Sequence, residues 1–299
     1  MAKIVVIGSS NTDMVIRTGR LPAPGETVLG GEFLMNPGGK GANQAVAAAR
    51  LGADVTFVAR VGDDIFGREA VQHFKAEGVD TGYIEIDAGK PSGVATIMVD
   101  AKGENCIAVA SGANLMLSSE DVDKAAKHVE AAAVILMQLE TPIPTVEHAA
   151  MLGRRMGKCV ILNPAPAQPL PDTLLAGLDI ITPNETEAEI LTGIKVTDQT
   201  SAKNAAQALR KKGVGTVIIT LGSQGAYIQS ETISRIMPAK RVTPVDTTAA
   251  GDTFNGALAV GLASGLLIEA AVDFANKAAA ISVTRMGAQA SAPYLYEIE

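Results

Sequence analysis

The sequence has few of the side chains that metal and redox sites use. Its 299 residues include only two cysteines and three histidines. Cys106 and Cys159 form no CxxC pair, so the sequence predicts neither a zinc knot nor a disulfide framework, and we expect two buried free thiols. His73, His128 and His148 lie in amphipathic helical stretches without an HExxH or GxSxG motif, which argues against zinc and serine hydrolases.

Positive charge and long apolar runs are also missing. The net charge is −7, with no lysine and arginine block and no tryptophan, so we expect no binding to nucleic acid or to an anionic membrane surface. A local cationic pocket could still hold a phosphorylated ligand. No apolar run reaches the roughly 18 residues of a spanning helix, and the run in "MAKIVVIG" is too short for a signal-peptide core. We therefore expect a cytoplasmic protein that binds small molecules.

The sequence does contain short β-rich runs that alternate with alanine-rich segments of helical length. Runs such as "KIVVIG", "DVTFVARVG", "CVILNP" and "TVIITLG" predict an α/β fold with a central, mainly parallel sheet flanked by helices on both faces. Gly52, Gly78 and Gly213 are placed where helices should end. Residues 13–35 and 83–109 instead read as short strands joined by turns, and predict a small inserted β-sheet.

The stretch "VDTTAAGDTFNGA" combines small residues with a predicted helix start near Gly251. The amides of a first helical turn lack intrahelical acceptors, and small residues let an anion such as phosphate approach them. A carboxylate here would repel that anion unless it had a task, and accepting a proton from an attacking hydroxyl is such a task for Asp252. Taken alone, Asp252 would be interpreted as a helix cap.

A second glycine-rich stretch, "NPGGKGANQAVAAA", also precedes a predicted helix but is not a Walker P-loop. Leucine stands where the first glycine belongs, and Gly41 replaces the serine or threonine. Lys40 and Asn43 could donate hydrogen bonds to a hydroxyl-rich ligand. The segment "GSSNTD" lacks GxGxxG, which argues against a dinucleotide site, although Asn11 and Asp13 are suitably placed to bind sugar hydroxyls.

Together these motifs resemble those of the ribokinase (PfkB-type) family of carbohydrate kinases. The segments "PGGKGANQAVAAARLGADV" and "DTTAAGDTFNGAL" resemble its two signatures, while "PNETEAE", "TLGSQGA" and "TRMGAQAS" resemble motifs that complete it over nearly the whole chain. The resemblance implies a single ribokinase-like domain over residues 1–299. It also implies that the inserted strands form a small β-sheet lid through which a homodimer assembles.

The resemblance further implies a role for each matching residue. Asp252 is expected to be the catalytic base, with the amides of Ala249, Ala250 and Gly251 forming the anion hole. The residues expected to bind the sugar, in addition to Asp252, are Asn11, Thr12, Asp13, Gly39, Lys40, Gly41, Asn43 and Glu140. Those expected to bind ATP are Asn184, Glu187, Thr220, Leu221, Gly222, Ser223, Gln224, Gly225, Gly251 and Asn276.

Two cations are implied as well. Glu187 is expected to act through the hydration shell of Mg²⁺, although Asn184 and Glu187 alone are typical of a helix cap with a capping box. The residues that match a monovalent-cation loop, expected to hold K⁺ partly through backbone carbonyls, are Asp246, Thr248, Ser282, Arg285, Gly287 and Ser291. Without the resemblance, Asp246 would be interpreted as a turn cap.

The expected reaction is the ATP-dependent phosphorylation of D-ribose at O5, giving ribose 5-phosphate and ADP. Ribose is favoured because "GGKGAN" and "GAQAS" resemble ribokinases more than fructokinases or adenosine kinases. Deoxyribose, fructose or a nucleoside such as adenosine remains an alternative substrate. A non-catalytic sugar-binding regulator is a further alternative, but it would be expected to lack the base that Asp252 supplies.

Overall fold

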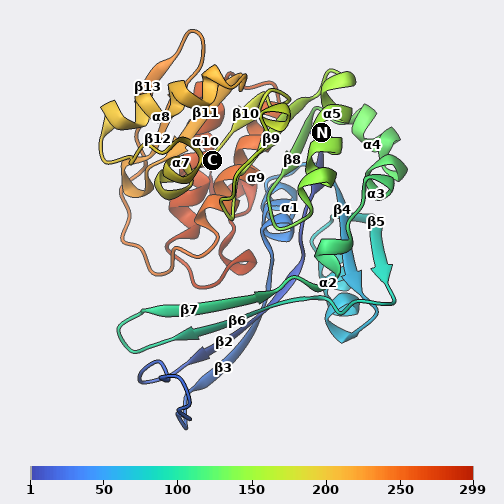
Figure 1. Ribbon diagram of the computed structural model, residues 1–299, viewed down its shortest axis with the longest axis vertical. Helices are drawn as coiled ribbons and strands as arrows, with labels where there is room; N and C mark the ends of the chain where they lie inside the picture. The colour runs from blue at the N-terminus through green and yellow to red at the C-terminus, as the bar shows by residue number, and fades with distance from the viewer. Residues whose placement is uncertain (1, 299) are drawn as a thin grey trace.

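The computed structural model describes residues 2–298, which form a large and a small β-sheet (Figure 1). The large sheet has nine strands in the order β13-β12-β11-β10-β9-β8-β1-β4-β5, and within it only the pairs β11–β12 and β12–β13 are antiparallel. Its strands are β1 (Lys3–Ile7), β4 (Asp54–Gly62), β5 (Asp80–Asp87), β8 (Val134–Met137), β9 (Cys159–Leu162), β10 (Ile180–Ile181), β11 (Thr216–Thr220), β12 (Ala226–Gln229) and β13 (Ser234–Met237). The predicted mainly parallel sheet is confirmed.

Helices cover both faces of the large sheet, as predicted. Successive strand residues point to opposite faces, so in β1 Val5 and Ile7 pack into one core while Ile4 and Val6 pack into the other. The second core is completed by α1 (Lys40–Arg50), α2 (Ile65–Ala76), α9 (Ala250–Ala263) and α10 (Ile268–Ser282). The first is completed by α3 (Ser119–Lys124), α4 (Ala126–Ala131), α5 (Ile143–Arg155), α6 (Asp172–Leu175), α7 (Glu185–Thr192) and α8 (Gln199–Lys211).

The small sheet projects from one end of this body (Figure 1). Its four strands have the order β3-β2-β6-β7 and are β2 (Asn11–Arg17), β3 (Glu32–Gly38), β6 (Gly93–Val99) and β7 (Asn105–Ala110). The strands therefore extend beyond the first expected segment, 13–35, at both ends. The second expected segment, 83–109, begins too early, because residues 83–87 pair with β4 as part of β5 in the large sheet.

Two local predictions have different outcomes. Gly52, Gly78 and Gly213 follow α1, α2 and α8 with positive φ angles of 87°, 78° and 104°, as expected for residues that end helices. The prediction of two buried thiols is wrong for Cys106, which is exposed because it lies on β7, an edge strand with every residue exposed. Between residues 2 and 298, no helix has both the length and the apolar character needed to cross a membrane.

The contact between α1 and α9 depends on the glycine at position 256. A Cβ atom at Gly256 would lie 2.8 Å from the Ala47 Cβ and 2.8 Å from the Gln44 carbonyl oxygen, so the α9 backbone rests directly on α1. Asp252 lies one helical turn before Gly256 and therefore faces the start of α1. The distance between these two helices fixes what the Asp252 side chain can reach.

We predict that Gly256→Ala destabilises the protein by about 1–2 kcal/mol, because overpacking against α1 outweighs the gain in helix propensity. Gly251→Ala is the matched control, since a Cβ atom there meets nothing within 4 Å. The control should keep or slightly raise stability. Urea unfolding of both variants measures the difference, and an equal or higher midpoint for Gly256→Ala would contradict the close-contact argument.

Candidate active site

The turn that precedes α9 has an unusual backbone. Ala249 is the N-cap residue, and its φ of 56° makes it the only non-glycine residue with positive φ within residues 2–298. An alanine pays a conformational cost in this region, and such strain concentrates at functional sites. Ala250 and Gly251 begin the helix, and the space beside Gly251 is open. The predicted helix start near Gly251 is thus observed, with room for an anion to approach its amides.

The Asp252 carboxylate is buried and bonds to α1 rather than capping its own helix. It is 5% exposed, and α9 has no side-chain cap. The Asn43 amide donates to Oδ2 over 2.9 Å, and the Gln44 amide donates to Oδ1 over 2.9 Å. The structure therefore supports a role for Asp252 other than capping and holds both carboxylate oxygens in fixed directions.

Several charged groups surround this carboxylate. The pKa of Lys40 is raised chiefly by the attraction of Asp252, and further by Glu140, Glu187 and Asp13, against the opposing effect of burial. Burial, followed by repulsion from Glu140 and Asp252, raises the pKa of Asp13 to about 6. Burial also raises the pKa of Glu187. One ammonium thus balances several carboxylates, and the site carries net negative charge when all of them are ionised.

The residues expected to bind a sugar come together from three segments. Asn11, Thr12 and Asp13 open β2, Gly39 caps α1, and Lys40, Gly41 and Asn43 lie in its first turn. Glu140 follows β8 and accepts hydrogen bonds from the Ser9 hydroxyl and, over 2.9 Å, from the Lys40 amide. These bonds connect the end of β1, the start of α1 and the loop after β8.

The glycines of "GGKG" permit close packing within the protein itself. A Cβ atom at Gly39, whose φ is 89°, would lie 2.7 Å from the Asn11 nitrogen. One at Gly41 would lie 2.5 Å from the Ser9 nitrogen, and one at Gly38 would lie 2.3 Å from the Asp13 carboxylate. The glycines therefore bring α1 against the β1–β2 connection. The buried Asn43 Oδ1 has no hydrogen-bond partner within residues 2–298 and suits a hydroxyl donor.

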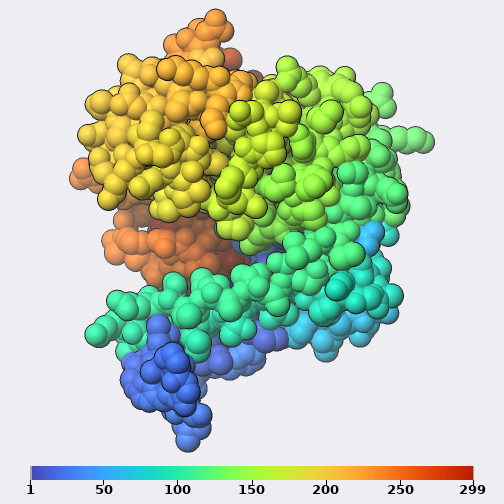
Figure 2. Space-filling model, in the orientation of Figure 1, coloured from blue at the N-terminus to red at the C-terminus, as the bar shows by residue number. Residues whose placement is uncertain are grey.

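A hollow of about 1100 Å³ lies between the small sheet and the body, and Figure 2 shows the sheet, in blue and teal, standing apart from the orange C-terminal region. One face of the sheet lines it with Asp13, Val15, Leu34, Asn36, Ile97 and Ile107. Apart from Asp13, these residues were not identified from the sequence. Their signal is the alternation along β2, β3, β6 and β7, which places every second residue on one face.

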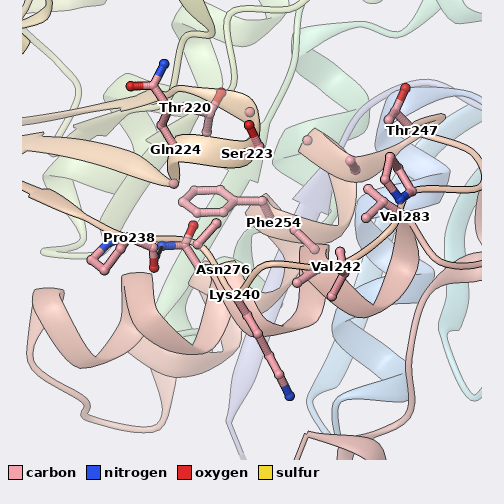
Figure 3. A pocket seen from close by; sticks show the side chains of 18 of the residues that line it. Thr220, Ser223, Gln224, Pro238, Lys240, Val242, Thr247, Phe254, Asn276 and Val283 are labelled. Atoms are coloured by element: carbon pink, nitrogen blue, oxygen red, sulfur yellow. Dashed lines mark hydrogen bonds between the residues drawn. The ribbon is translucent and has the colours of Figure 1, made fainter. Parts of the chain in front are cut away.

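A second hollow of about 850 Å³ contains most of the residues expected to bind ATP (Figure 3). It adjoins the first, because Pro244 and Thr247 line both. The expected residues that line it are Asn184, Thr220, Gly222, Ser223, Gln224, Gly225, Gly251 and Asn276. Leu221 does not line it, because its side chain packs into the hydrophobic core, and Glu187 does not line it either.

Sequence reasoning missed the part of this hollow formed by Lys240, Arg241, Val242, Phe254, Ala279 and Val283. In Figure 3 the Phe254 ring lies between Ser223 and Asn276. The Asn276 amide donates to the Met237 carbonyl over 3.1 Å, which ties α10 to the end of β13. The basic pair at 240–241, just before the "VDTTAAGD" stretch, was the available sequence signal.

Asn184 and Glu187 form a capping box at the start of α7. The Glu187 amide donates to Asn184 Oδ1 over 2.8 Å, and the Asn184 amide donates to Glu187 Oε2 over 2.9 Å. The local structure that the pair alone suggests is therefore present. It does not exclude a second role, because Glu187 Oε1 takes no part in the box.

The segments expected to form a cation loop lie side by side, because the Val245 and Asp246 amides both donate to the Val283 carbonyl. Asp246 Oδ1 accepts from the Thr248 amide over 2.9 Å and from its hydroxyl over 2.6 Å, while Asp246 Oδ2 accepts from the Gly287 amide over 2.9 Å. The Ser282 and Ser291 hydroxyls instead donate to nearby backbone carbonyls, and the Arg285 guanidinium pairs with Glu297. Asp246 is thus a turn cap that also ties two distant loops together.

The raised pKa of Asp13 gives a prediction about stability. Because folding raises this pKa from 3.8 to about 6, the native state binds the proton more tightly than the unfolded state, and stability falls as pH rises through this window. Asp13→Asn removes the free-energy cost of ionising this buried carboxyl group. The variant should therefore be more stable than the parent by about 1–3 kcal/mol at pH 7.5. The gain should disappear below about pH 4.

Denaturant unfolding at pH 7.5 and pH 4 measures this effect. Asp54→Asn, at an exposed position, is the matched control and should change stability little at either pH. A variant Asp13→Asn that is no more stable than the parent at pH 7.5 would contradict the electrostatic description of the site.

Comparison with known proteins agrees with this geometry. The family model described as "pfkB family carbohydrate kinase" matches residues 1–295. A ribokinase from Haemophilus influenzae is 48% identical over 97% of this chain and 95% of its own length, and a deoxyribokinase from Salmonella typhimurium is 42% identical over 97% and 95%. A structure of Arabidopsis thaliana ribokinase complexed with ribose and ATP has a TM-score of 0.91 and 34% identity, covering 100% of this chain and 98% of that one. This chain belongs to the pfkB family of carbohydrate kinases.

Proposed function

We propose that this protein transfers the γ-phosphoryl group of ATP to O5 of D-ribose, giving ribose 5-phosphate and ADP. The observation that carries the proposal is the position of Asp252. Its buried carboxylate lies at the start of α9, whose Gly251 lines the nucleotide hollow, and contacts Asn43 from the set expected to bind the sugar. The full-length similarity to ribokinases supports ribose as the acceptor.

In the proposed reaction the Asp252 carboxylate accepts the proton of the ribose 5-hydroxyl as that oxygen attacks the γ-phosphorus. The bond from O5 to phosphorus forms while the bond from phosphorus to the bridging oxygen of ADP breaks. The amides at the start of α9 stabilise the negative charge on the transferring group, together with the positive end of the helix dipole. Lys40 holds positive charge beside the base, because surrounding carboxylates raise its pKa.

Glu187 fits a position near Mg²⁺ bound to the nucleotide. Its carboxylate is near Lys40 and Asp252, and its Oε1 is not used by the capping box. When bound, Mg²⁺ neutralises charge on the ATP phosphates, and a carboxylate near it can accept hydrogen bonds from its water ligands. We propose that Glu187 serves in this way, while Asn184, Thr220 and the loop from Gly222 to Gly225 hold the nucleotide.

The acceptor sugar is the part of the proposal that a substrate panel tests. If Asp13 accepts hydrogen bonds from ribose hydroxyls, a sugar that lacks one leaves the buried carboxylate with an unmet bond. This costs about 1–3 kcal/mol, or about 5- to 150-fold in kcat/KM. Ribose should therefore exceed 2-deoxyribose by that factor, with fructose lower still, and Asp13→Ala should remove most of the ribose advantage. ADP release with each sugar measures this.

Deoxyribose is the second candidate, because a deoxyribokinase matches this chain at 42% identity over nearly its whole length. A higher kcat/KM for 2-deoxyribose than for ribose would replace the proposed substrate and leave the kinase reaction in place. A higher value for fructose or adenosine would do the same. Thus the panel separates the identity of the sugar from the identity of the reaction.

We also propose that K⁺ binds near Asp246 and raises the rate by fixing the turn before Ala249. Asp246 and Thr248 suit such a site, because both supply oxygen atoms and the carboxylate already ties this turn to Gly287. Replacing K⁺ by tetramethylammonium at constant ionic strength should lower the rate, and Asp246→Ala should abolish the response. A wild-type rate that ignores K⁺ would contradict the assignment.

A homodimer is proposed through the outer face of the small sheet, which acts as a lid over the sugar. Phe33, Met35 and Ile16 lie on the face opposite Asp13 and are 60%, 48% and 39% exposed. Such an apolar face on a sheet is a typical contact surface. Light scattering at micromolar concentration should give twice the chain mass, and Phe33→Glu should give the monomer. Leu267→Glu, at an 80% exposed site on the body, is the control and should remain a dimer. A monomeric parent protein would refute the proposal.

A further inference from the structure

Gln44 is a fully buried amide behind the Asp252 carboxylate. Its side chain is 0% exposed and lies in α1, where neighbours such as Ala45 and Ala48 are apolar and buried. Its amide nitrogen donates to Asp252 Oδ1 over 2.9 Å and to Asn163 Oδ1 over 3.0 Å, and its Oε1 accepts from the Gln138 amide over 2.5 Å. Every polar atom of this side chain is therefore used.

These contacts also determine the orientation of the amide. If the nitrogen and oxygen of Gln44 were exchanged, its oxygen would face the acceptor oxygens of Asp252 and Asn163, while its nitrogen would face the donor amide of Gln138. All three contacts would then become repulsive. The direction in which Gln44 donates is thus fixed by the groups around it.

The network continues back to the start of α9. The Asn163 amide donates to the Thr182 carbonyl over 3.3 Å, and the Thr182 hydroxyl donates to Asn255 Oδ1 over 2.6 Å. The Asn255 amide then donates to the Gly251 carbonyl over 2.8 Å. Two branches of one buried network therefore end on adjacent residues of the catalytic turn, Gly251 and Asp252.

We propose that Gln44 is a positioning residue that fixes the Asp252 carboxylate for proton transfer, an inference that rests on the proposed kinase function. Gln44 is held from both sides by Gln138 and Asn163, whereas Asn43 has a free Oδ1 and belongs to the expected sugar contacts. The Gln44 side chain is 0% exposed, so it presents no surface to a bound ligand. It therefore acts on the orientation and charge of the base rather than on substrate binding.

Charged groups around Asp252 make its hydrogen bond from Gln44 important. Asp252 interacts with Lys40 of α1, Asp13 of β2 and Glu187 of α7. Lys40 attracts this carboxylate, while Asp13 and Glu187 repel it. The amide of Gln44 donates to the charged form, so its loss should favour protonation of the base.

The test replaces Gln44 with methionine, which has a similar length and no hydrogen-bonding amide. We expect Gln44→Met to lower kcat by about 10- to 100-fold, while KM for ribose stays within about 3-fold. The acid limb of the kcat profile should also move to higher pH. Gln44→Glu should move that limb in the same direction, because a second carboxylate beside Asp252 opposes its ionisation.

Gln229→Met is the matched control, since Gln229 is also buried but bonds to Tyr227 in β12, outside both hollows. It should lose stability without changing the pH profile. Gln138→Met removes only the bond to Gln44 Oε1 and should shift the pH profile less than Gln44→Met does. This second variant still tests the proposal if Gln44→Met does not fold. Ribose binding by calorimetry verifies folding of each variant.

A folded Gln44→Met with the parent's kcat and pH profile would overturn the proposal, and so would a fall in kcat with an unshifted profile. If Gln44→Met fails to fold, an unshifted profile for Gln138→Met overturns it. These outcomes are distinct from failure of the proposed substrate, which appears as parent enzyme that prefers another sugar. The same profiles are then measured with that sugar.

Discussion

The close contact between α1 and α9 is the constraint on which the site depends. Gly256 lets the α9 backbone rest on α1, and this spacing places Asp252 within hydrogen-bond reach of Asn43 and Gln44. Each helix begins at a glycine-rich or small-residue turn at the same end of the sheet, where ligands bind in α/β folds. The carboxylate thus lies between the residues proposed to bind the sugar and those proposed to bind the nucleotide.

The fold separates a buried polar centre from a more open surface. The base, its amide partners and the polar network beneath them are buried, so leaving any member unpaired would be costly. The small sheet instead presents one face to the hollow and an apolar face outward. The proposed sugar contact and the proposed subunit contact therefore use opposite faces of the sheet.

Sequence patterns predicted the features that depend on local order along the chain. The alternation of strands and helices and the start of α9 are observed, because hydrophobic period and small-residue turns are local properties. Leu221 could not be assigned this way, since a motif does not show which way a side chain points. Gln44 was missed for the same reason: it looks like an ordinary helix residue until the sheet brings Gln138 and Asn163 beside it.

The most direct test of the account is turnover by Asp252→Asn under conditions where substrate binding is measured separately. Asparagine keeps the size of the side chain but cannot accept the proton of the sugar hydroxyl as a carboxylate does. We expect ribose and a non-hydrolysable ATP analogue to bind with nearly unchanged affinity, and kcat to fall by at least ~100-fold. A folded variant that binds both ligands and turns over within a few-fold of the parent would contradict the assignment of Asp252 as the base.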